Sequence, residues 1–136
     1  MTIAHNTILT PTNSAVTFGG PLQLPPVRLV IRDNIIGGGL YGVKGPGHGA
    51  GTPTISAFMQ GGAFVGNVLV LPNASGYPGG NAFVSSWASL GFANVGSLNF
   101  RLSDRSDYRK RGSDGRDPGA DMDALDAAIA GVVVVP

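Results

Sequence analysis

Ile31-Arg32-Asp33-Asn34-Ile35-Ile36 is the stretch that decides the fold, because two other segments repeat its pattern. The pattern is an apolar residue, two residues of any kind, Asn, one residue and an apolar residue. It recurs in Ile3-Ala4-His5-Asn6-Thr7-Ile8 and in Phe64-Val65-Gly66-Asn67-Val68-Leu69. The Asn residues are 28 and 33 positions apart, and repeats of roughly 20–50 residues are typical of stacked architectures.

Each repeat predicts a short strand, a bend at the Asn and a second strand. Asn tolerates the left-handed backbone conformation and caps turns, so Asn6, Asn34 and Asn67 are predicted to stack as a structural ladder at equivalent bends. Breaks such as Gly37-Gly38-Gly39, Gly45-Pro46-Gly47 and Gly61-Gly62 divide the rest into strand-length pieces. Loops that protrude from the stack are expected near 20–27, 44–56 and 72–82.

Charge is distributed unevenly along the chain. Residues 1–100 contain only Arg28, Arg32, Asp33 and Lys44, whereas every other charged side chain lies within 101–126. We therefore interpret 1–100 as the coils of the stack. Residues 101–136 are interpreted as a charged C-terminal loop, a capping helix and an apolar tail within the same domain.

The helix is predicted over 122–130. Asp121 is a suitable N-cap, and Met122, Leu125 and Ile129 share one face at helical spacing. This helix is expected to cap the C-terminal end of the stack. Val132–Val135 is expected to form a short apolar strand.

Composition excludes several classes of site and partner. The chain has no Cys, which excludes disulfides and thiolate metal sites, and its net charge of +1 gives no reason to expect nucleic acid. No apolar run approaches the roughly 18–20 residues that span a bilayer, so no membrane partner is expected. The N-terminus has no signal-peptide pattern.

Residues 101–126, the charged segment, also resemble part of a known protein family. Leu102-Ser103-Asp104-Arg105-Ser106-Asp107-Tyr108 and the stretch from Gly112 to Leu125 resemble the C-terminal ending of bacterial right-handed parallel β-helix proteins of the pectate-lyase-like superfamily. Asp107 stands where that family usually has proline. The resemblance implies an all-β fold, a right-handed parallel β-helix of about three to four coils with a short C-terminal helix and tail. It also implies an extracellular or cell-surface parent protein whose sugar-binding or catalytic face would lie in earlier coils.

Catalytic chemistry finds little support in the sequence. Glycoside hydrolysis generally uses two carboxylates, and residues 1–100 offer only Asp33. Arg32 and Asp33 are adjacent and are expected to lie on a solvated strand edge. His5 and His48 are 43 positions apart with no ligating residue type beside them. No catalytic residue and no cofactor are therefore predicted.

Asp114, Asp117, Asp121 and Asp123 form the densest polar cluster. Closely spaced oxygen ligands on a Gly-rich loop suit Ca²⁺, but the pattern is not that of an EF-hand. The other interpretation is a turn with ion pairs to neighbouring arginines. Four aromatic residues also have two interpretations, as a platform that stacks on sugars or as ordinary packing: Tyr41, Tyr77, Trp87 and Phe92.

The function expected from the sequence is that of a non-catalytic structural or self-assembling module. A homo-oligomer or a filament is expected, because residues 1–100 carry few charges that would oppose strand pairing between copies. The alternatives are a polysaccharide-binding module and the remnant of a carbohydrate-active lyase or hydrolase.

Overall fold

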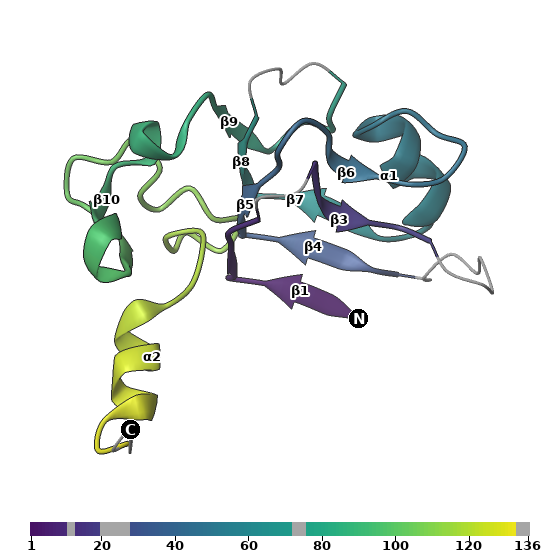
Figure 1. Cartoon of the computed structure of the whole chain (residues 1–136). Helices are drawn as coiled ribbons and strands as arrows, with labels where there is room; N and C mark the ends of the chain where they lie inside the picture. The colour runs from purple at the N-terminus through teal and green to yellow at the C-terminus, as the bar shows by residue number, and fades with distance from the viewer. Residues whose placement is uncertain (11–12, 20–27, 72–75, 133–136) are drawn as a thin grey trace.

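The computed structural model describes residues 1–10, 13–19, 28–71 and 76–132. Three small parallel sheets account for most of its strands (Figure 1). The first sheet has the strand order β1 (Thr2–Ala4), β4 (Val30–Arg32), β7 (Ala63–Val65). The second sheet has the order β2 (Thr7–Ile8), β5 (Ile35–Gly37), β8 (Val68–Val70), β9 (Ala82–Val84). The third sheet pairs β3 (Ser14–Thr17) with β6 (Gly42–Lys44).

Strand register in these sheets follows the repeated sequence pattern. Ile3 pairs with Ile31, which pairs with Phe64 on its other side. Ile8, Ile36 and Leu69 align in the same way in the second sheet. The apolar positions of the three segments therefore lie above one another, as the successive strands in Figure 1 show.

The predicted all-β right-handed parallel β-helix is wrong. The structure is mixed α/β: of the described residues, 19% are helical and 29% lie in strands. The strands form separate small sheets, one of them antiparallel, instead of one continuous solenoid. The sequence pattern covered only three bends, and it did not constrain the longer segments between and after them.

Helix α1 (Thr52–Phe58) is the first departure from an all-β chain. Pro53 lies in its first turn, where a missing N–H costs nothing, and the helical residues include no Gly. Thr54 is buried; its hydroxyl accepts a hydrogen bond from the Gly45 N–H and donates one to the Gly49 carbonyl. The predicted protruding loop at 44–56 is therefore partly this helix, which packs beside β6 (Figure 1). The loop predicted at 20–27 lies outside the described residues, as do residues 72–75 of the loop predicted at 72–82; residues 76–81 lie in no helix or strand and precede β9.

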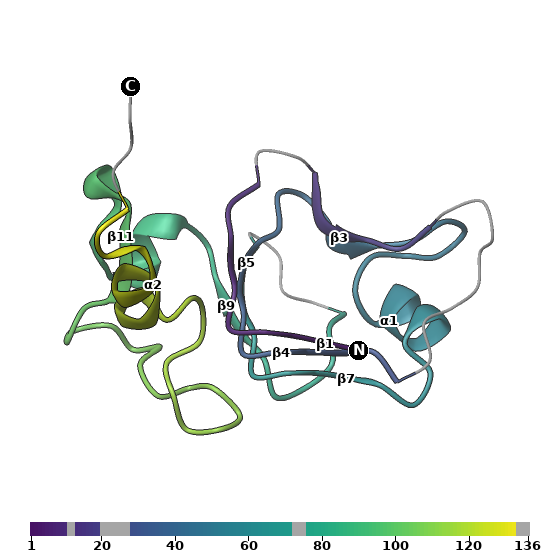
Figure 2. The same cartoon turned by 90° about the horizontal axis from the view of Figure 1, so that it is seen from below.

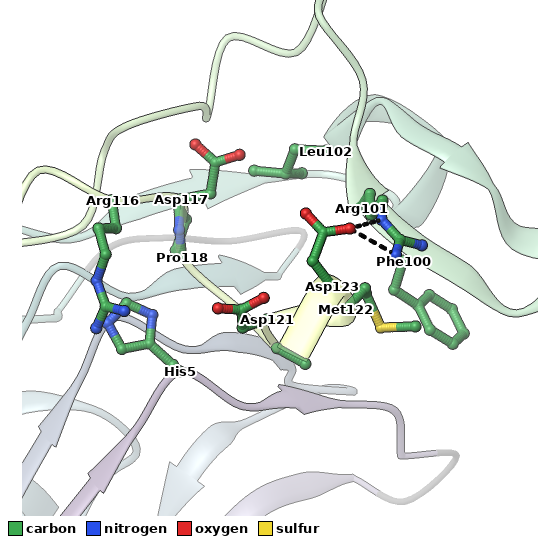
Figure 3. Close-up of a pocket in the computed structure, with 12 residues that line it drawn as sticks. His5, Phe100, Arg101, Leu102, Arg116, Asp117, Pro118, Asp121, Met122 and Asp123 are labelled. Carbon is green, nitrogen blue, oxygen red and sulfur yellow. Dashed lines mark hydrogen bonds and ion pairs between the residues drawn. The ribbon is translucent and has the colours of Figure 1, made fainter. Parts of the chain in front are cut away.

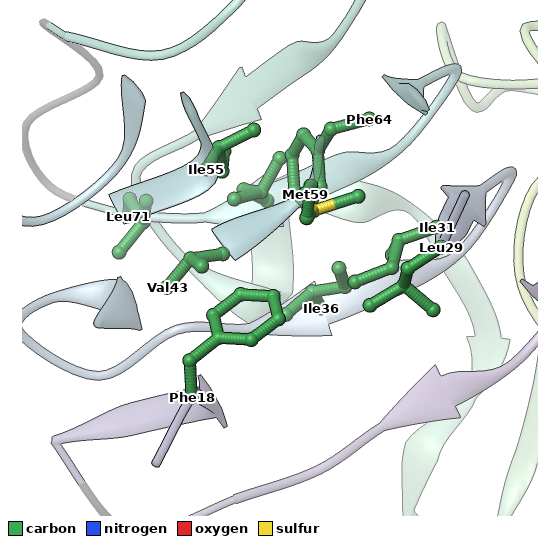
Figure 4. Packing of buried hydrophobic residues seen from close by; sticks show 10 residues of the cluster. Phe18, Leu29, Ile31, Ile36, Val43, Ile55, Met59, Phe64 and Leu71 are labelled. Carbon is green, nitrogen blue, oxygen red and sulfur yellow. The ribbon is translucent and has the colours of Figure 1, made fainter. Parts of the chain in front are cut away.

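Two apolar clusters form the core. The larger one lies between the parallel sheets and α1, and it includes Phe18, Ile31, Ile36, Val43, Ile55, Met59, Phe64 and Leu71 (Figure 4). The smaller one joins the second parallel sheet to the following segment through Ile35, Val68, Val84, Leu90 and Leu102. The two halves of the chain therefore pack against each other.

After β9 the chain leaves the parallel sheets. The 3₁₀ helix η1 (Trp87–Leu90) precedes β10 (Phe92–Asn94), the 3₁₀ helix η2 (Val95–Ser97), and β11 (Asn99–Leu102), which pairs antiparallel with β10. A long irregular segment then leads to α2 (Met122–Ile129). In both views this half lies beside the parallel sheets (Figures 1 and 2).

Helix α2, which was expected to cap the C-terminal end of the stack, lies beside β11 (Figure 2). No residue of α2 is buried, and Leu125 and Ile129 are 46% and 52% exposed. Arg101 on β11 forms ion pairs with Asp123 and Asp126, which attach the helix to β11. The apolar tail prediction concerns 132–135, of which 133–135 lie outside the described residues.

Candidate functional site

Four bends that lead into strands β2, β5, β8 and β9 of the second sheet share a positive backbone φ. The residue before the Asn has a positive φ in each: 52° at His5, 57° at Asp33, 68° at Gly66 and 79° at Gly80. This left-handed region costs a non-glycine residue roughly 1–2 kcal/mol, so the surrounding contacts must hold His5 and Asp33 there. Their conformation places functional side chains at successive bends.

The Asn residues after these positions form a continuous hydrogen-bonded chain. The Asn6 N–H donates to Asn34 Oδ1 at 2.9 Å, and the Asn34 N–H donates to Asn67 Oδ1 at 3.1 Å. The side-chain Nδ2 groups of Asn6 and Asn34 donate to the same oxygens. Asn34 and Asn67 are fully buried, whereas Asn6 is exposed. The structure thus brings together the three Asn residues that the sequence singled out.

A fourth member, Asn81, was missed. It accepts hydrogen bonds from the N–H and Nδ2 of Asn67, both at 3.0 Å, and donates to the Phe64 carbonyl. Only 14 positions separate it from Asn67, and the described residues between them include β8 but no strand of the first or third sheet. The signal in the sequence was Gly80-Asn81, which repeats Gly66-Asn67.

Asp33 is fully buried at its bend, so the expected solvated strand edge is wrong. Its carboxylate accepts hydrogen bonds from the N–H and hydroxyl of Ser113 at 2.5 and 3.0 Å, and it pairs with Arg32. Gly66 at the next bend leaves room for this arrangement, since a Cβ there would lie 2.2 Å from Asp33 Oδ1. The contact fastens the charged segment to the parallel sheets.

His5, Asp33 and Asp114 form the centre of a polar cluster. His5 Nε2 lies 2.9 Å from Asp114 Oδ2 and 3.8 Å from Asp33 Oδ2. Arg32 Nη1 contacts the Asp33 carboxylate and lies 3.8 Å from Asp114 Oδ2. The backbone N–H and then the guanidinium of Arg116, followed by His5, hold the pKa of Asp114 well below its usual range. The Asp114 carboxylate is therefore ionised at neutral pH.

A polar cavity of about 200 Å³ opens next to this cluster (Figure 3). Three separate segments line it: the first bend through His5, β11 through Phe100–Leu102, and the charged segment through Arg116–Asp123. Figure 3 shows Arg101 bound to Asp123 at one end and His5 with Arg116 at the other. The cavity combines acidic and basic groups with one aromatic ring.

The four aspartates that were considered for calcium do not converge on one point. Asp117 accepts from the Lys110 N–H and lies 3.5 Å from Arg109 Nε. Asp121 is the N-cap of α2 and accepts from the Ala124 N–H, while Asp123 binds Arg101. Within the described ranges, the group of possible metal ligands that does converge is His5, Asp33 and Asp114.

The other candidate side chains lie apart. Lys44 Nζ donates to the His48 carbonyl and sits 5.9 Å from the centre of the Tyr41 ring. Tyr77 packs between Phe64 and Phe83. Trp87 and Phe92 stack at 6.2 Å and line an apolar groove of about 300 Å³ with Leu9, Val95, Leu98 and Phe100. The four aromatic residues considered for sugar stacking therefore do not form one platform.

The chain matches no protein-family model, and no curated protein or solved structure shows significant similarity to it. In the part of the chain that the structure describes, no helix has both the length and the apolar character required to cross a bilayer. Functional inference therefore rests on the geometry of the residues alone.

Proposed function

We propose that this chain is a non-catalytic structural module that pairs with a second copy of itself through the edges of β1 and β2. The proposal rests on Asn6, which is the first member of the hydrogen-bonded row of Asn residues. Asn6 is exposed, and each buried Asn of the chain accepts two hydrogen bonds from the Asn of the preceding bend. Within the described residues, no such donor reaches Asn6 Oδ1.

The strands at this end are open on the same side. β1 and β2 are each the first strand of their sheet, and each pairs on one side only among the described strands. An edge of this kind presents unpaired N–H and C=O groups, which can hydrogen-bond to another strand. Residues 1–27 carry no Lys, Arg, Asp or Glu, so like-charge repulsion between two such edges is small.

The opposite end of the parallel sheets is covered by the chain itself. The Gly66 N–H donates to the Gly80 carbonyl, and Asn81 Nδ2 donates to the Phe64 carbonyl. The Tyr77 hydroxyl accepts from the Val43 N–H on β6. At this end β9 is the last strand of the second sheet, but β6 and the bend after β7 have these contacts with the following chain. Because the two ends therefore differ, a closed two-fold dimer fits better than a filament, which would need two complementary ends.

Sedimentation equilibrium across a concentration series tests this proposal. We expect a mass of twice 13.8 kDa at high concentration. Thr2→Lys places a charge on the exposed face of β1 and should yield monomers, whereas Ala127→Lys on the exposed α2 should leave the dimer intact. A constant mass of 13.8 kDa, or equal behaviour of the two variants, would contradict the proposal.

A second candidate function, saccharide binding, is supported by the polar cavity. Planar charged side chains beside the Phe100 ring are suited to hydroxyl groups and to the apolar face of a sugar ring. The volume of about 200 Å³ suits a single sugar residue better than a long oligosaccharide. A glycan array followed by calorimetry of any hit would test this, with Arg116→Ala expected to weaken binding and Arg105→Ala, outside the cavity, expected to leave it unchanged.

A further inference from the structure

We propose that His5, Asp33 and Asp114 form a binding site for a divalent transition-metal ion of the zinc type. This inference is independent of the proposed dimer. The three residues come from the first bend, the second bend and the charged segment, and their ligand atoms all lie within 4.8 Å of one another. A single ion could therefore contact all three after small side-chain movements.

The distances between the ligand atoms support this geometry. Zinc binds His nitrogen and carboxylate oxygen at about 2.0–2.2 Å, so two of its ligand atoms lie about 3.0–3.5 Å from each other. The distances from His5 Nε2 to Asp114 Oδ2 and to Asp33 Oδ2 are 2.9 and 3.8 Å. Binding thus requires adjustments of less than about 1 Å at His5.

The carboxylate of Asp33 is preorganised for such a role. It is fully buried, and Ser113 holds both of its oxygens through the backbone N–H and the hydroxyl. Hydrogen bonds from neighbours to a ligating carboxylate orient it, and they are a regular feature of metal sites. The identical backbone conformation at His5 and Asp33 brings the two side chains together at successive bends.

The Arg32 guanidinium already occupies part of the proposed metal position. Arg32 Nη1 contacts Asp33 and lies 3.8 Å from Asp114 Oδ2, so the guanidinium and the ion would compete for the same two carboxylates. The Arg32 side chain is 34% exposed and can swing into solvent. Arg116 Nε lies 2.9 Å from the same Asp114 Oδ2, and its side chain, which is 63% exposed, would also have to yield this oxygen to the ion. Arg32 is the competitor that lies close to both carboxylates.

The ligand set selects the kind of ion. One imidazole nitrogen with two carboxylate oxygens suits zinc and its neighbours, whereas calcium prefers six to eight oxygen ligands. Three protein ligands leave a position for water. The chain has no Cys and only two His residues, so a metal bound through imidazole can be traced to His5 or His48.

Titration of the full chain with Zn²⁺ by isothermal calorimetry tests the proposal. We expect one site per chain, and a higher midpoint of thermal unfolding with Zn²⁺ but not with Ca²⁺, because an ion that binds only the folded state stabilises it. His5→Gln removes one of the three proposed ligands and should weaken binding by more than the roughly tenfold that losing a mere hydrogen-bond partner of a ligand costs. His48→Gln is the matched control, since His48 is exposed in a loop, and it should bind as the parent does.

The Arg32→Gln variant distinguishes a metal site from an ion-pair cluster that has only a structural role. Removing the competing guanidinium should tighten Zn²⁺ binding, even though the loss of its pair with Asp33 lowers stability without metal. Absence of Zn²⁺ binding, equal affinity of the parent and His5→Gln, or weaker binding by Arg32→Gln would each overturn the proposal. Circular dichroism of each variant at the titration temperature verifies that it is folded.

Discussion

Ser113 donates two hydrogen bonds to the buried carboxylate of Asp33, although the two residues are 80 positions apart. Ser113 lies in the charged segment, and Asp33 lies at the bend between β4 and β5. Gly119, six positions after Ser113, also donates its N–H to the Asp33 carbonyl. These contacts join the irregular charged segment to the parallel sheets at Asp33.

Asp33→Asn hardly changes the size of the side chain, but it should destabilise the protein because it alters these hydrogen bonds. The amide retains the shape but cannot accept at both oxygens, so the Ser113 hydroxyl and Arg32 lose their acceptor. We expect a decrease in the free energy of unfolding of about 2–3 kcal/mol, measured by urea denaturation. Asp104→Asn is the control: Asp104 is 95% exposed and pairs only with Arg109, so its change should stay below about 0.5 kcal/mol.

Asn34 and Asn6 occupy equivalent bends but should differ in their contribution to stability. Asn34 is fully buried, and its Nδ2 donates to the carbonyls of Ile3 and Arg32. Asn34→Ala removes these hydrogen bonds and those that Asn34 Oδ1 accepts from Asn6, and it should lower the free energy of unfolding by about 1–3 kcal/mol. Asn6→Ala removes an exposed side chain and should cost clearly less. Equal values by chemical denaturation would show that the buried amides contribute nothing special.

Gly66→Ala tests the space that Asp33 requires. Gly66 has a φ of 68°, and a Cβ there would lie 2.2 Å from Asp33 Oδ1 and 2.9 Å from the Ser113 nitrogen. Gly115→Ala introduces the same left-handed strain, at a φ of 77°, but into open space. Strain alone should cost about 1 kcal/mol, and Gly66→Ala should exceed that by displacing the carboxylate. Thermal melts of the two variants give the difference, and similar midpoints would refute the steric argument.

Tyr77 should make stability depend on pH in the alkaline range. Its hydroxyl donates to the Tyr41 carbonyl and accepts from the Val43 N–H, and burial raises its pKa above the ordinary value of 10.0. The folded state therefore holds the phenolic proton more tightly than the unfolded chain does. The stabilisation is fully present below pH 10.0 and is lost as the pH rises through the higher folded-state pKa.

Tyr77→Phe provides the comparison for this pH effect. The variant should be less stable at neutral pH by about 1–2 kcal/mol, because the Val43 N–H loses its partner. Between pH 9 and 11 the difference in unfolding free energy between the parent and the variant should shrink. A constant difference across that range, measured by urea denaturation, would mean that Tyr77 titrates alike in both states.

The sequence by itself indicated the features that depend on local spacing. Asn6 and Asn34 are 28 positions apart in the sequence. Ile3 and Ile31, which pair in the first sheet, are separated by the same number of residues, so the repeat spacing sets the strand register. Asp121 lies at the start of α2, where its carboxylate accepts from the Ala124 N–H. Such signals involve residues within one turn or one bend, so their geometry follows from backbone conformation and capping chemistry.

Only the tertiary structure decided which distant segments meet. The burial of Asp33, its bond to Ser113 and its proximity to His5 depend on the path of the chain over 80 residues, and no local pattern records that path. The same holds for the antiparallel pairing of β10 with β11 and for α2, whose apolar residues remain exposed although their spacing favoured packing. Spacing determines which face of an element is apolar, but the free energy of burial depends on whether another element lies against that face.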